Sequence, residues 1–288
     1  MSKKVNFSSI ISGTMTWGEW GKNYSTKEMA SLIEHCVSIG VSTFDHADIY
    51  GDYSNEAEFG AAFKESGIER ESIELISKCG ISRVCDRRNY MVHHYNYTKE
   101  YIINSVKQSL QNLQTDYLDV LLLHRPSPLM NPYEISEAIT YLKNKEMIRS
   151  FGVSNFTPSQ LSMIDKQLKV EINQIEISLT KYDSMYNGQL DQCIEKKILP
   201  MSWSPLGTAM NKENPKLTMT LERLAKKYSL EVSQILIAWL VKHPAGIIPV
   251  VGTTQKDRIS QALEASKVDL ELEDWFDLLE ATRGHQIE

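Results

Sequence analysis

The segment Leu118–His124 reads L-D-V-L-L-L-H, a short apolar run that is typical of a strand and that ends on a histidine. It follows a helical pattern in which Ile102, Val106, Leu110 and Leu113 share one face. The same alternation of strand, polar turn and amphipathic helix recurs along the chain. The eight predicted strands are Ser9–Thr14, Val41–Asp45, Ile73–Ser77, Leu118–Leu123, Ser150–Val153, Val170–Ile175, Leu199–Trp203 and Ile247–Val251.

Strands separated by helices predict right-handed parallel crossovers, and eight such units predict closure into a barrel. We therefore expect an α/β fold with a single (β/α)8 barrel domain over residues 1–288, since such barrels need about 250 residues. The alternative is an open, doubly wound sheet. No G-x-G-x-x-G follows any predicted strand, which counts against a dinucleotide-binding sheet of that kind.

Local signals place the ends of several helices. Ser25-Thr-Lys-Glu28 forms a capping box, and Gly40 supplies the stop for the same helix. Thr157-Pro158 predicts an N-cap followed by proline at the first helical position.

Composition narrows the class of protein. A net charge of −6 argues against a broad nucleic-acid surface, because phosphate binding needs clustered Lys and Arg. The longest apolar runs are too short to cross a bilayer, and no apolar signal core follows the lysines of Met1–Asn6. The four cysteines are scattered and indicate reduced thiols. We therefore expect a cytoplasmic protein, monomeric by default, with no nucleic-acid or membrane partner.

Four polar residues lie where the predicted strands end. Asp45, Lys78 and His124 come at the ends of three strands, and Tyr50 lies in the loop after Asp45. In a parallel barrel all these ends open on one face, where such folds place their active sites.

The four side chains suit one chemistry. A free tyrosine has a pKa of about 10, and we expect the Lys78 ammonium to lower it, with Asp45 holding the lysine in place. His124 could orient a carbonyl oxygen, so the set could polarise a C=O group and protonate the alkoxide as it forms. Taken one at a time, these residues could have a purely structural role. An Asp–Lys pair can stabilise the fold, and a histidine at a strand end can be a hydrogen-bonded core residue.

A longer set of motifs resembles the aldo-keto reductases. It comprises G-T-M-T-W-G (13–18), F-D-H-A-D-I-Y-G (44–51), Lys78, L-L-L-H-R-P (121–126), G-V-S-N-F (152–156), N-Q-I-E (173–176), W-S-P-L-G (203–207) and V-V-G-T-T-Q-K-D-R (250–258). The resemblance is greatest to bacterial oxidoreductases of the YdhF type. It implies an NADPH-dependent reductase of a small carbonyl substrate, NADH also being possible, with Tyr50 as general acid aided by Lys78, Asp45 and His124.

The resemblance also implies a cofactor site. Ser154, Asn155 and Gln174 match positions that hold the nicotinamide carboxamide, and Trp203 matches an aromatic that lies against the nicotinamide ring. The remaining predicted cofactor residues are Gly13, Thr14, Met15, Ser204, Pro205, Leu206, Gly207, Gly252, Thr253, Thr254 and Arg258.

The segment after the last predicted strand bears on cofactor choice. Gly252, Thr253 and Thr254 precede a helix whose N-terminus favours an anion, and Arg258 could bind the 2′-phosphate of NADPH. The sequence departs from the family twice, because Gly252 replaces a common lysine and Ala262 a common asparagine. Lys256 could compensate for the first.

Other residues are predicted around the pocket. Trp17 and Trp20 are expected to line it, with rim packing as the alternative. The long connection Cys79–Tyr97 is either a substrate lid or a solvated loop over the barrel rim. Its cysteines and histidines fit no usual zinc spacing, so we expect no metal.

Two other functions remain open. Lys78 could be the nucleophile of a Schiff-base aldolase. The chain could also be a nonenzymatic NADP(H)-binding regulatory module, because the same fold serves as a regulatory subunit of potassium channels.

Overall fold

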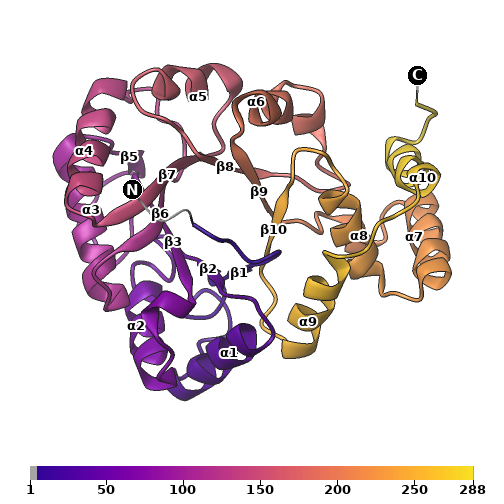
Figure 1. The fold of residues 1–288 in the computed structure, drawn as a ribbon, viewed down its shortest axis with the longest axis horizontal. Coiled ribbons are helices and arrows are strands. Elements are labelled where there is room, and N and C mark those ends of the chain that lie inside the picture. The colour runs from indigo at the N-terminus through magenta and orange to yellow at the C-terminus, as the bar shows by residue number, and fades with distance from the viewer. Residues whose placement is uncertain (1–4, 288) are drawn as a thin grey trace.

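A computed structural model of the chain describes residues 5–287 and shows eight parallel strands closed into a barrel (Figure 1). The barrel strands are β1 (Ile11–Gly13), β2 (Thr43–Asp45), β3 (Glu74–Cys79), β6 (Leu118–Leu123), β7 (Ile148–Ser154), β8 (Ile172–Glu176), β9 (Leu199–Trp203) and β10 (Ile248–Val251). They pair in this order, and β10 closes on β1 through Ile11 and Val250. The predicted barrel is confirmed, and each strand overlaps its predicted run. The lysines at positions 3 and 4 lie outside the described residues.

Helices surround the barrel (Figure 1). They are α1 (Thr26–Ser38), α2 (Asn55–Ser66), α3 (Lys99–Leu113), α4 (Pro132–Asn144), α5 (Pro158–Asp165), α6 (Gln189–Lys196), α7 (Pro215–Tyr228), α8 (Val232–Val241), α9 (Lys256–Ala265) and α10 (Leu272–Arg283). Short 3-10 turns occupy Arg70–Ser72, Asp183–Met185 and Ala209–Asn211. The predicted capping box at Ser25 and the N-cap at Thr157 are confirmed, and Gly40 follows α1 with φ +92°.

Two helices lie outside the strand–helix alternation. α7 is an additional helix before α8 between β9 and β10, and α10 is an additional helix after α9. α7 and α10 pack against each other at the edge of the molecule (Figure 1). Lys227 of α7 forms ion pairs with Glu271 and Asp274 at the start of α10. Trp275 of α10 stacks on Trp239 of α8 with ring centroids 4.9 Å apart.

The barrel interior explains why polar residues gather at one end. One buried apolar cluster holds inward-facing side chains from the strands: Ile11, Ile76, Val120, Leu122, Ile172, Met201 and Val250. Because side chains alternate along a strand, the next inward position lies two residues later. That position is Lys78 on β3, Gln174 on β8 and Trp203 on β9. The alternation that fills the barrel with apolar groups therefore places these three side chains together at its C-terminal end.

The long connection after β3 contains a small antiparallel sheet of β4 (Ile81–Ser82) and β5 (His94–Tyr95). It is attached to the barrel rim through arginines. Arg83 forms an ion pair with Asp52 and lies over the ring of Trp20, while Arg87 pairs with Glu19. These contacts hold the connection over the loops that follow β1 and β2.

No helix within residues 5–287 combines the length and apolar character that a membrane span requires.

Candidate active site

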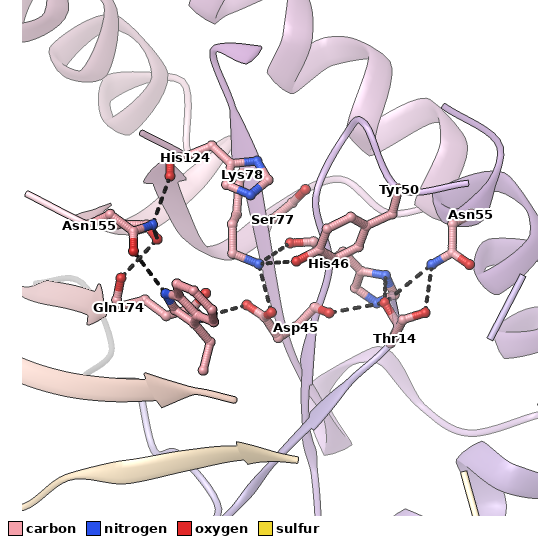
Figure 2. A network of polar contacts seen from close by, with 12 residues as sticks. Thr14, Asp45, His46, Tyr50, Asn55, Ser77, Lys78, His124, Asn155 and Gln174 are labelled. Atoms are coloured by element: carbon pink, nitrogen blue, oxygen red, sulfur yellow. Dashed lines mark hydrogen bonds and ion pairs between the residues drawn. The ribbon is translucent and has the colours of Figure 1, made fainter. Parts of the chain in front are cut away.

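Lys78 is the centre of a buried polar cluster at the C-terminal end of the barrel (Figure 2). Its Nζ donates to Oδ2 of Asp45 at 2.6 Å, to the carbonyl of His46 at 2.8 Å and to the hydroxyl of Tyr50 at 3.1 Å. The side chains of Lys78 and Asp45 are 1% and 4% exposed. The structure thus brings together three of the four residues that the sequence placed in one site, although they come from separate segments.

The ammonium of Lys78 is stabilised in its charged form. Burial alone lowers the pKa of Lys78, but the Asp45 carboxylate and the Tyr50 hydroxyl outweigh it, and the net pKa is raised. All three ammonium hydrogens have acceptors in this cluster. Lys78 is therefore a fixed cation and not a free amine.

The pKa of Tyr50 departs from the prediction. Burial raises the pKa of the phenol, Lys78 acts in the opposite direction, and the net pKa lies above its ordinary value. The predicted effect of Lys78 has the right direction, but the expected net lowering is wrong. Removing the phenolate from water raises the pKa by more than the ammonium, itself paired with Asp45, lowers it. Tyr50 is thus protonated at neutral pH. Because Lys78 is the donor in their contact, the phenol hydrogen remains available to a substrate.

His124 lies beside Tyr50 in an edge-on arrangement, with the two ring centroids 6.0 Å apart. Burial, with smaller contributions from Lys78 and Arg125, holds the pKa of His124 well below its usual value. The imidazole is therefore neutral and can donate one ring hydrogen. Its Nδ1 is buried without a hydrogen-bond partner among the described residues.

Asp45 is also held from across the barrel. Nε2 of Gln174 on β8 donates to Oδ1 of Asp45 on β2 at 2.9 Å, so each carboxylate oxygen has a donor (Figure 2). Gln174 keeps its second amide hydrogen and its oxygen, and it remains a candidate for binding the nicotinamide. Ser154 donates to the carbonyl of Gln174 and joins the same network.

Thr14 has a different role from the predicted one. Its side chain has no exposed surface, and its hydroxyl contacts the carbonyl of Asp45, Nδ1 of His46 and Nδ2 of Asn55. Nothing of Thr14 is left for a cofactor, so that assignment is corrected: Thr14 holds β1 against β2. Gly13 is also buried, where β10 approaches it closely, and Met15 of the same motif is exposed at the rim.

Asn155 joins β6, β7 and β9. It has φ +63°, its Nδ2 donates to Oγ of Ser154 at 2.8 Å, and its Oδ1 accepts from the indole N–H of Trp203 at 2.9 Å. A weaker contact of 3.4 Å reaches the carbonyl of His124 (Figure 2). The residues matched to the nicotinamide site therefore lie beside the Tyr50 cluster, and Trp203 is oriented by a hydrogen bond.

A groove of about 880 Å³ begins at the residue after Trp203. It is lined by seven of the residues that the sequence predicted for the cofactor: Ser204, Pro205, Leu206, Gly207, Gly252, Thr253 and Arg258. Lys212, Glu231 and Ser233 also line it and were not predicted. Thr254 is not among the lining residues. The groove runs from the residues that follow Trp203 to the start of α9.

The start of α9 is suited to an anion. Its N-cap, Gln255, makes no side-chain cap bond, so the first backbone N–H groups of the helix remain free beside the groove. Arg258 lies on the same turn and forms no ion pair with the carboxylates of residues 5–287. Lys256 does not compensate for Gly252, because its ammonium donates to Ser31 on α1 at 2.9 Å and it does not line the groove.

The two tryptophans after β1 have separate positions. Trp17 is fully buried in the core against Phe44 and Phe59, so the prediction that it lines the substrate pocket is wrong. A large ring that packs between β2 and α2 stabilises the fold and has no surface left for a substrate. Trp20 is half-buried, with its ring centroid 6.1 Å from that of Tyr50.

The comparisons with known proteins agree with this geometry. The model of the aldo/keto reductase family matches residues 9–282. The chain belongs to the aldo/keto reductase family. It is 42% identical to the oxidoreductase YcsN of Bacillus subtilis, over 100% of this chain and 98% of that protein. It is 36% identical to the oxidoreductase YdhF of Escherichia coli, over 98% of this chain and 95% of that protein.

A solved aldo-keto reductase of Klebsiella pneumoniae, in complex with NADPH, has the same fold. It superposes with a TM-score of 0.80 at 23% identity, over 98% of this chain and 92% of that one. The predicted family, its YdhF-like character and its oxidoreductase class are thus confirmed.

Sequence reasoning also missed two residues at the catalytic cluster. His46 supplies a carbonyl to Lys78, and Arg125 directly follows His124 with its guanidinium over the ring of Trp203. Arg125 could have been found from the motif L-L-L-H-R-P, since a residue next to a strand-end histidine shares its location. The contact with His46 could not have been found from the sequence, because Lys78 bonds to the backbone carbonyl and any residue type supplies that group.

Proposed function

We propose that this chain is an NADPH-dependent reductase that transfers a hydride between nicotinamide and an aldehyde or ketone, with Tyr50 as the proton donor. One observation carries the proposal. The Tyr50 hydroxyl touches a buried, charged lysine, and a groove of cofactor size begins at the residue after Trp203, which Asn155 orients beside this cluster. The cluster supplies acid chemistry, and the groove supplies a place for the reductant.

In the direction of reduction, each residue of the cluster has a separate role. NADPH bound in the groove would supply the hydride that the carbonyl carbon accepts. Tyr50 donates its phenol hydrogen to the carbonyl oxygen, and the adjacent Lys78 ammonium stabilises the phenolate that remains. Neutral His124 donates a hydrogen bond that orients the carbonyl oxygen. Asp45, held by Gln174, keeps the ammonium charged and in position.

The residues present fit the cofactor. Trp203 offers an oriented aromatic surface for the nicotinamide, and Asn155 and Gln174 offer amide groups beside it. The free N–H groups at the start of α9, with Arg258, suit the 2′-phosphate that distinguishes NADPH from NADH. The NADPH found in the Klebsiella structure supports the same assignment.

The geometry disfavours the aldolase. A Schiff base requires a neutral amine, whereas Lys78 has a raised pKa and donates all three hydrogens to buried acceptors. Borohydride treatment with an aldehyde should therefore leave Lys78 unmodified.

Turnover separates the enzyme from a regulatory module. The purified protein is expected to oxidise NADPH when an aldehyde from a small panel is added, followed by the loss of nicotinamide absorbance. If NADPH quenches tryptophan fluorescence but no aldehyde causes its oxidation, the chain binds the cofactor without catalysing reduction, and the reductase proposal fails.

Replacing Arg258 with Gln is expected to raise the Kd for NADPH by about 10- to 100-fold, because a charge-assisted contact with the 2′-phosphate is lost. The Kd for NADH should change little, since NADH lacks that phosphate. Both values can be measured by fluorescence quenching. Lys256→Gln is the matched control, because that lysine lies on the same helix turn but points to Ser31. An equal loss for both cofactors would contradict the 2′-phosphate contact.

A further inference from the structure

We propose that Arg125 makes this site selective for carbonyl substrates that also carry a carboxylate. The proposal rests on the reductase function and adds the substrate class. It is carried by the position of a guanidinium beside the catalytic cluster that pairs with no carboxylate of residues 5–287.

The backbone of Arg125 is held rigidly. The hydroxyl of Tyr97 donates to the carbonyl of Arg125 and accepts from its N–H at 3.1 Å. Tyr97 is itself 5% exposed and packs against Gly80, where an added Cβ would lie 1.9 Å from Cε1 of the tyrosine ring. The two ends of the long connection after β3 thus anchor the residue that follows His124. An anchored backbone gives the side chain a defined starting point above the site.

The side chain of Arg125 extends from the end of β6 toward β9. Its Cζ lies 5.5 Å from the ring centroid of Trp203, whose indole N–H is fixed by Asn155. Its charge also reaches the reacting groups, because Arg125 is one of the cations that act to lower the pKa of Tyr50 and of His124. The guanidinium is therefore placed beside the location of the carbonyl.

Arg125 has no carboxylate partner among the residues that the structure describes. Among residues 5–287 the neighbouring arginines of the long connection are paired, Arg83 with Asp52 and Arg87 with Glu19, whereas Arg125 forms no such pair. The nearby Asp45 is neutralised by Lys78 at 2.6 Å. The half-buried Arg125 guanidinium thus adds one positive charge that no carboxylate of residues 5–287 compensates, and desolvating a charge is costly unless a counter-charge is supplied.

The chemistry of that counter-charge follows from the guanidinium. Its planar N–H groups match the two oxygens of a carboxylate, and such paired contacts are stronger than neutral hydrogen bonds. The anion could come from the substrate or from the pyrophosphate of the cofactor. Ser204 to Gly207 already line the groove along which the pyrophosphate would run, whereas Arg125 is not among its lining residues. We assign the anion to the substrate.

The experiment compares two aldehydes of equal length, 4-oxobutanoate and butanal, with NADPH as reductant. The wild type should prefer 4-oxobutanoate in kcat/KM by about 10- to 100-fold, the size expected for a charge-assisted contact. In Arg125→Gln that ratio should fall to near one through a higher KM for the acid, and in Arg125→Lys it should be intermediate. Arg87→Gln is the matched control and should keep the wild-type ratio, because Arg87 is exposed and already paired.

The possible failures are distinguishable. Turnover of both aldehydes at equal kcat/KM in the wild type would overturn the carboxylate assignment and leave the reductase function standing. If Arg125→Gln raises the KM for NADPH and leaves the ratio of kcat/KM for the two aldehydes unchanged, Arg125 contacts the cofactor. That result would also overturn the carboxylate assignment. If neither these two aldehydes nor any other of the panel is reduced, the reductase function fails. Butanoate then provides a separate readout, because its quenching of tryptophan fluorescence should occur in the wild type and disappear in Arg125→Gln. Equal quenching in both proteins would overturn the assignment.

Discussion

Replacing Tyr50 with Phe is expected to lower kcat by about 10²- to 10⁴-fold, the usual contribution of a positioned general acid. The variant loses the hydrogen that would pass to the carbonyl oxygen. The Lys78 ammonium keeps its two shorter contacts, to Asp45 and to the His46 carbonyl, so the cluster remains charged and ordered. NADPH binding should be nearly unchanged, because Tyr50 does not line the groove.

Steady-state rates and fluorescence titration of NADPH together check this prediction. Tyr53→Phe is the matched control: this tyrosine lies three positions later, and its hydroxyl bonds the backbone of Arg83 and Ile81. Its loss should cost far less turnover. Retention of most of the wild-type kcat in Tyr50→Phe would remove Tyr50 from the role of proton donor.

Replacing Lys78 with Met is expected to destabilise the fold by about 3–5 kcal/mol in addition to abolishing turnover. Methionine fills much of the same space but leaves the Asp45 carboxylate buried with Gln174 as its remaining side-chain donor. An uncompensated charge inside a barrel is more costly than the loss of the pair itself. Urea unfolding, followed by circular dichroism, measures the free-energy change.

The double variant Asp45→Asn, Lys78→Met separates charge from packing. Removing both charges should recover part of the stability lost in Lys78→Met, so the two substitutions should be clearly non-additive. If the double variant is as unstable as the sum of the single ones, the loss comes from packing around Lys78 and not from the orphaned carboxylate.

Much of the barrel and of its polar cluster could be predicted because both follow from local rules. Strand periodicity and helix caps, such as the capping box at Ser25, depend on neighbouring residues and persist in the fold. Asp45, Lys78 and His124 could be placed on one face because all parallel strands of a barrel end at the same rim. The packing of α7 against α10 could not be predicted, because it joins segments that are far apart in the sequence and no local pattern indicates it.

The failed predictions concern burial and competing contacts. Trp17 and Trp20 stand three positions apart, yet one fills the core and the other borders Tyr50. Thr14 belongs to a cofactor-like motif, but its hydroxyl is used within the barrel. The direction of the Tyr50 pKa shift depended on how deeply the phenol is buried, which its neighbours in sequence do not reveal.

The amino-acid sequence by itself determined the strand–helix alternation, the family and the identity of the reacting groups, because these depend on residue type and spacing. Only the tertiary structure decided which groups have partners. It left Tyr50 protonated beside a charged Lys78, turned Lys256 away from the groove, and gave Arg125 no carboxylate partner within residues 5–287. The physical reason is that desolvation and charge pairing depend on distances between segments that are far apart in the chain, and folding sets those distances.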